Sequence, residues 1–119
     1  MEIFEQCLVP LVKTFRPGLL IISAGFDAHW TDPLTSMGLS TSGYYALSKK
    51  LVELAQEVCN GKIVFVLEGG YNPRNVANGV RAVFAALTGN PPPQVNDPSK
   101  YAEPDISARL KAFQAWHKL

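Results

Sequence analysis

The chain has few cysteines and no long hydrophobic run. Its two cysteines, Cys7 and Cys59, are far apart and form no C-x-x-C pair, which favours buried free thiols over a disulfide or a cysteine-rich metal site. No apolar run approaches the ~20 residues of a membrane-spanning helix. The first residues lack the basic start and apolar stretch of a secretory signal. We therefore expect an intracellular, soluble protein, in the cytoplasm or in the nucleus of a eukaryote.

The chain also lacks an excess of charge of either sign. It has 11 Lys and Arg against 10 Asp and Glu, for a net charge of +1. This balance gives no direct signal for binding to nucleic acid or to an anionic membrane surface. The 119 residues are 47% hydrophobic, which is typical of one small globular domain with a modest core.

Hydrophobic spacing predicts the order helix, strand, helix, strand, helix, and so an α/β fold. Both strands are apolar throughout, as expected in a parallel sheet with helices on both faces. Proline at position 10 should kink or restart the first helix. The expected helices span residues 2–15, 43–59 and 73–89, and the strands span 19–22 and 63–67.

We expect three segments along the chain. Residues 1–89 form the α/β part, 90–105 form a proline-rich connector, and 106–119 form a C-terminal helix that packs on the domain or on a partner. Two strands are fewer than the roughly four to six of a stable open sheet, and both sheet edges would be unpaired. We therefore expect the chain to be part of a larger fold.

Acidic residues and a histidine follow the first strand, where ligands bind in open α/β sheets. Asp27 is open to two interpretations, a metal ligand or general base on one hand and a loop-capping carboxylate on the other. His29 shares a side with Asp27 only in extended backbone, which favours a partly exposed loop residue. Asp32 precedes Pro33 and is most simply a turn former.

A glycine-rich loop follows the second strand and contains Glu68, Gly69, Gly70, Tyr71 and Asn72. It precedes a helix N-terminus, where anions bind, but it lacks a phosphate-binding loop pattern and its lysine. The tyrosine could offer its hydroxyl to an oxyanion or pack on the surface as a loop aromatic.

The segment SAGFDAHWTDPL, followed about forty residues later by VFVLEGGYN, resembles the C-terminal half of the zinc-dependent histone deacetylase superfamily. The LEGGY form is similar to the class II branch and to the bacterial acetylpolyamine and acetoin-utilisation branch. The resemblance covers residues 4–89 and implies the C-terminal part of a three-layer α/β/α parallel-sheet fold of the arginase and deacetylase type.

The resemblance also implies roles for individual residues. Asp27 corresponds to a zinc ligand, and Tyr71 corresponds to the tyrosine that donates its hydroxyl to the substrate carbonyl. Gly69 and Gly70 correspond to glycines that keep the acyl-lysine tunnel narrow, and Leu34 corresponds to an apolar residue of the tunnel wall. The implied substrate is an acetylated lysine peptide, of a histone or another protein, or an acetylated amine.

The chain departs from the family pattern in one respect. The family's other two zinc ligands, an upstream Asp-x-His motif, and its paired catalytic histidines are missing, since the only Asp-x-His here is Asp27 to His29. We therefore expect a deacetylase fragment that is inactive alone and whose partner is the missing N-terminal portion of the catalytic domain. The alternative is a non-catalytic interaction module derived from a deacetylase.

Overall fold

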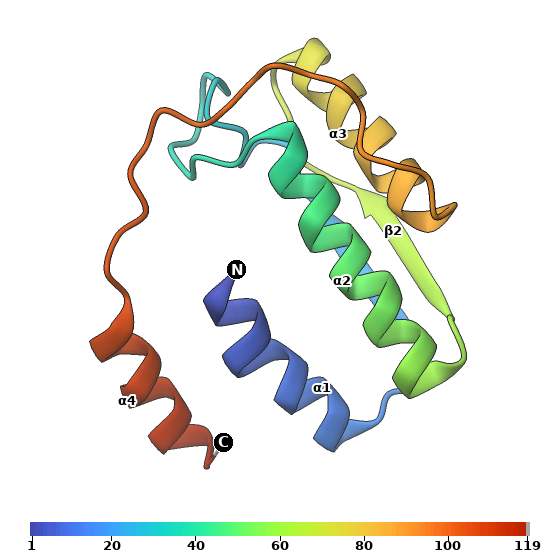
Figure 1. Cartoon of the computed structure of the whole chain (residues 1–119), viewed down its shortest axis with the longest axis vertical. Helices are drawn as coiled ribbons and strands as arrows, with labels where there is room; N and C mark the ends of the chain where they lie inside the picture. Colours follow the sequence, from blue (N-terminus) through green and yellow to red (C-terminus); the bar gives the residue numbers. More distant parts are fainter. Residues whose placement is uncertain (119) are drawn as a thin grey trace.

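The structure, a computed structural model, describes residues 1–118. Its sheet has two parallel strands, β1 (Leu20–Ala24) and β2 (Ile63–Leu67), with Leu20 opposite Ile63 and Ala24 opposite Leu67. Helix α2 (Thr41–Cys59) connects the strands, and α3 (Pro73–Leu87) follows β2 and packs beside α2 (Figure 1). The α/β fold with a parallel pair of strands is confirmed.

Residues 2–15 are helical without a break, so Pro10 does not restart the helix, but the hydrogen-bonding pattern changes from π-helical to α-helical just before it. A π-helical segment, η1 (Phe4–Leu8), precedes the α-helix α1 (Val9–Phe15). Proline has no N–H for the carbonyl four residues earlier, and its ring crowds that carbonyl, so the wider π-turn accommodates it. The freed carbonyl belongs to Gln6, and it accepts a hydrogen bond from Gln114 Nε2 at 3.4 Å.

Local side chains cap the N-termini of α2 and α3, as the sequence indicates. The Ser40 hydroxyl accepts from the Gly43 N–H at the start of α2, and the Asn72 side chain caps α3. Each cap satisfies an N–H that has no partner within its helix. These caps place the ends of both helices beside the loops that follow β1 and β2.

Within residues 1–118, helices cover only one face of the sheet. Hydrophobic side chains of β1 and β2 pack on that face against α1, α2 and α3. On the other face Ile21 is 66% exposed and Val64 is 47% exposed. The expected second helical layer is therefore not supplied by these residues. The side chains on the covered face are Leu20, Ile22, Ala24, Ile63 and Phe65.

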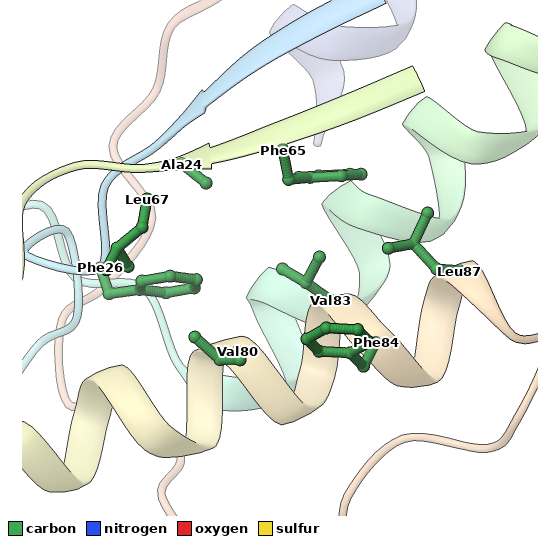
Figure 2. A pocket seen from close by; sticks show the side chains of 8 residues that line it. All are labelled: Ala24, Phe26, Phe65, Leu67, Val80, Val83, Phe84 and Leu87. Atoms are coloured by element: carbon green, nitrogen blue, oxygen red, sulfur yellow. The ribbon is translucent and has the colours of Figure 1, made fainter. Parts of the chain in front are cut away.

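An apolar groove of about 210 Å³ lies between the end of the sheet and α3 (Figure 2). Phe26, a buried residue two positions beyond the end of β1, lies at one end of the groove. The ring of Phe26 rests against α3 at Gly79, where a Cβ would lie 2.1 Å from Phe26 Cδ1. Only glycine allows this close approach between the ring and the helix backbone.

The chain after α3 contains one further helix. No helix or strand is present between Leu87 and Ser107, and α4 (Ser107–His117) packs against η1. The predicted helix over 106–119 is thus shorter at both ends, and Leu119 lies outside the described residues. Across residues 1–118, every helix is too short or too polar to cross a membrane.

We expect Gly79→Ala to destabilise the chain, although alanine is the better helix former by about 1 kcal/mol. The added methyl collides with the Phe26 ring, and overpacking of a core costs about 1–3 kcal/mol. Urea unfolding measures the change. Gly18→Ala is the matched control, since a Cβ at Gly18 has no atom within 4 Å. Equal stability of the two variants would contradict this packing.

Candidate functional site

Backbone pairing continues past the ends of both strands and brings their loops together. The Glu68 N–H donates to the Ala24 carbonyl at 3.1 Å, and the Phe26 N–H donates to the Gly69 carbonyl at 2.7 Å. The acidic loop after β1 therefore lies beside the glycine-rich loop after β2. Such a position at the carboxyl ends of parallel strands is where α/β proteins bind ligands.

The Asp32 carboxylate joins the two loops. It is 7% exposed. Its Oδ1 accepts from the Leu34 N–H at 2.9 Å, and its Oδ2 accepts from the Tyr71 N–H at 3.0 Å. The bond to Leu34 confirms Asp32 as a turn former. The bond to Tyr71, which lies 39 positions further along the chain, is a second function that the sequence does not indicate.

Asp27 is partly buried and lies against the glycine-rich loop. A Cβ at Gly69 would lie 2.7 Å from both Cγ and Oδ2 of Asp27, and a Cβ at Gly25 would lie 2.7 Å from its Oδ1. Glycine at both positions leaves room for this carboxylate. The structure thus brings Asp27 and Gly69 together, as a shared site requires, while the role of Asp27 as a metal ligand stays a prediction.

The other predicted substrate contacts are exposed around this carboxylate. Tyr71 is 57% exposed and Leu34 is 67% exposed. Gly70 has a φ of 143° and lies against Val76 and Phe26, a backbone conformation that favours glycine. Tyr71 and Leu34 are therefore accessible to another molecule or to another part of a larger domain, and their roles stay predictions.

His29 is buried, and the expectation of a partly exposed loop residue is wrong. It is 2% exposed. The Thr31 N–H donates to its Nδ1 at 3.2 Å, which leaves Nε2 to donate to Asp97 at 3.0 Å. The Thr31 hydroxyl also lies 3.0 Å from Nδ2 of Asn75 in α3. Because both ring nitrogens have partners, the imidazole can be buried without losing hydrogen bonds.

Asp97 is a residue that the sequence analysis missed. It lies in the proline-rich connector, and the motif around it, NDPS, reads as an ordinary turn. Burial raises the pKa of the Asp97 carboxyl, but hydrogen bonds from Thr41 and His29 outweigh that effect, and the pKa lies below its usual value. The carboxylate is thus held in its charged form.

The two carboxylates of the acidic loop also affect a buried tyrosine. Tyr44 donates to the Gly25 carbonyl at 3.3 Å. Burial, with the negative charges of Asp27 and Asp32, raises the pKa of Tyr44 well above its usual value. The phenol therefore stays neutral and serves as a hydrogen-bond donor beneath the loop.

The donors in residues 1–118 do not form a complete zinc site. No three His, Cys, Asp or Glu side chains in this part of the chain are grouped closely enough to hold a metal ion. A catalytic zinc takes three protein ligands and one open position. Asp27 can therefore supply at most one of the protein ligands of such a site. Both cysteines are buried free thiols, as the sequence predicts.

The paired strands, with an acidic loop and a glycine-tyrosine loop at one edge, define an α/β protein with a strand-end site. The chain belongs to the histone deacetylase family, because residues 1–87 match the family described as Histone deacetylase domain. This family is generally zinc-dependent.

Individual relatives agree with this assignment. The chain is 45% identical over 87 residues to Histone deacetylase 14, chloroplastic, of Arabidopsis thaliana, covering 73% of this chain and 21% of that protein. It is 36% identical over 117 residues to Histone deacetylase 10, chloroplastic, of Oryza sativa subsp. japonica, covering 96% and 26%. The crystal structure of the HDA15 HD domain matches with a TM-score of 0.73 at 31% identity, covering 95% of this chain and 30% of that one.

The chain thus spans about a fifth to a quarter of the length of these two curated relatives. The match to the HDA15 domain confirms the fold as part of a deacetylase α/β domain.

We expect loss of the Asp32 carboxylate to separate the two loops. Asp32→Ala removes the acceptors of the Leu34 and Tyr71 N–H groups, so amide hydrogen exchange at both should rise about tenfold or more. Asp32→Asn keeps one acceptor oxygen and should lose protection at one of the two amides. The Leu20 amide, which donates to the Lys62 carbonyl at the opposite end of the sheet, is the internal control. Unchanged exchange at Tyr71 would contradict the cross-link.

Acid should release the connector from the loop. Because the folded-state pKa of Asp97 is lowered, its contribution to stability is present above the unfolded value of about 4 and is lost as pH falls through the lower folded value. The indole N–H resonance of Trp30, which donates to the Asp97 carbonyl at 3.0 Å, reports this release. Asp97→Asn should remove this acid transition, and an identical transition in that variant would contradict the assignment.

Proposed function

We propose that this chain forms part of a zinc-dependent deacetylase site, which removes acetyl groups from lysine side chains or from a related acetylated amine. The observation that carries the proposal is the joining of the two strand-end loops by Asp32, which places the loop of Asp27 beside the loop of Tyr71. Membership of the histone deacetylase family supports the reaction class.

Within this site we propose that Asp27 supplies one zinc ligand and that Tyr71 donates its hydroxyl to the substrate carbonyl oxygen as negative charge develops there. Gly69 supports the first role, since it leaves room for the Asp27 carboxylate. The exposure of Tyr71 supports the second role. Gly70 and Leu34 would then border the channel for the acylated side chain.

We also propose that the partner of this chain is the remaining, N-terminal portion of a deacetylase domain. The bare sheet face, with Ile21 and Val64 exposed, and the apolar groove of Figure 2 are surfaces that such a portion would cover. Large exposed apolar patches in soluble proteins are typical of interaction sites. The missing zinc ligands would come from the same portion, so the isolated chain should be inactive. We also propose that the chain functions inside the cell.

Acyl-lysine is the preferred substrate class. Residues 26–40, the sequence neighbours of Leu34, include no acidic side chain beyond Asp27 and Asp32, and Asp32 is already paired with two N–H groups. A polyamine would require further negative charge to bind its free amines. Assays should therefore compare an acetyl-lysine peptide with an acetylated polyamine.

The test uses a chimera that joins this chain to the N-terminal part of the Arabidopsis thaliana relative. We expect the chimera to bind zinc and deacetylate the peptide. Tyr71→Phe should lower kcat by about a hundredfold or more with zinc retained, and Asp27→Ala should lose zinc. Tyr45→Phe is the matched control, since the hydroxyl of Tyr45 donates to the Asn90 carbonyl instead.

An unchanged kcat in Tyr71→Phe, or full zinc content in Asp27→Ala, would refute the assigned role of that residue. The 119-residue chain measured alone should show neither stoichiometric zinc nor deacetylation. Activity of the isolated chain would overturn the proposal that it is incomplete.

A further inference from the structure

The connector returns to the loop that carries Asp27 and Asp32. It runs back along α3 and crosses the loop before α2 (Figure 1). There the Asp97 carboxylate accepts hydrogen bonds from His29 Nε2 at 3.0 Å and from the Thr41 N–H at 3.2 Å, and the Thr41 hydroxyl donates to it as well. His29 and Thr41 are 2% and 1% exposed. These contacts are therefore part of the buried structure.

Residues 95–101, here called the strap, make further contacts with the same loop. The Trp30 Nε1 donates to the Asp97 carbonyl at 3.0 Å. The Lys100 ammonium lies 5.2 Å from the centre of the Trp30 ring, within range of a cation–π interaction. Tyr101 lies against Gly38, where a Cβ would be 3.1 Å from Tyr101 Cδ2. The strap thus contacts the loop near its beginning and near its end.

The loop segment that Asp97 holds is closed on itself by its own backbone. The Trp30 N–H donates to the Leu39 carbonyl at 2.8 Å, and the Leu39 N–H donates to the Ala28 carbonyl at 2.9 Å. Asp97 binds the buried His29 on one side of this closure and Thr41, two residues beyond Leu39, on the other. A single carboxylate therefore holds together the two ends of the segment that contains Asp32 and Leu34.

We propose that the strap positions the acidic loop of the site and that Asp97 is its positioning residue. Pro98 restricts Asp97 to extended backbone, which lowers the entropy lost when the strap docks. The strap lies beyond residues 1–87, which match the family model, although the match to the Oryza sativa relative covers 96% of this chain. The effect on catalysis rests on the proposed function, whereas the effect on the loop does not.

Hydrogen exchange on the 119-residue chain tests the effect on the loop. Asp97→Ala should speed exchange at the Trp30 and Leu39 amides about tenfold or more, with the β1–β2 amides unchanged. Asp97→Asn keeps an acceptor oxygen in the same place and should recover most of that protection. Asp105→Ala is the matched control, because Asp105 is an exposed connector carboxylate whose hydrogen bonds within residues 1–118 go to Ser107.

Kinetics of the active chimera test the effect on catalysis. Asp97→Ala should lower kcat with little change in KM, Asp97→Asn should restore much of it, and Asp105→Ala should behave as the parent. Unchanged exchange and unchanged kcat in Asp97→Ala would overturn the proposal, as would loss of protection in the sheet that Asp97→Asn does not recover. An inactive parent chimera would count against the proposed function, and hydrogen exchange alone would then decide the role of the strap.

Discussion

The carboxylate of Asp32 is the interaction on which the site depends. It binds one N–H within its own loop and one from the loop after β2, so a single buried group sets the position of both. A carboxylate accepts such charge-assisted bonds strongly, and its burial makes each bond costly to lose. Through Asp32, the backbone of Tyr71 is held beside the loop that carries Asp27. The geometry of the candidate site therefore depends on Asp32, which positions the loops, as much as on the residues that would contact a substrate.

The distribution of hydrophobic side chains fits a chain that forms only part of a site. Its hydrophobic residues build two small clusters on one face of two strands, and they leave Ile21 and Val64 in solvent on the other face. The family model matches residues 1–87, which end with α3, and the strap and α4 that follow them return to the loop and to η1. The chain thus presents a positioned pair of loops at one edge and bare apolar surface elsewhere, which suits a piece of a larger domain.

Much of the fold could be predicted because its signals are local. Alternation of strands and helices, the caps at Ser40 and Asn72, and the disturbed helical pattern before Pro10 depend on neighbouring residues. The site could be predicted only in part. The motifs around Asp27 and Tyr71 are recognisable, but the burial of His29 depends on Asp97, which lies 68 positions away. No periodicity or turn pattern reports a contact of that range. The exposure of Ile21 and Val64 on one sheet face is likewise hidden in the sequence, because both strands are apolar throughout.

A crystal structure of the active chimera, with zinc located by its anomalous scattering, shows directly whether Asp27 and Tyr71 belong to one metal site. We expect zinc to be bound to an Asp27 carboxylate oxygen at about 2.0–2.2 Å. We also expect the Tyr71 hydroxyl to face the open coordination position of the zinc and Asp32 to remain bound to the Tyr71 N–H. Zinc held entirely by other residues, or the Tyr71 loop separated from Asp32, would contradict this expectation.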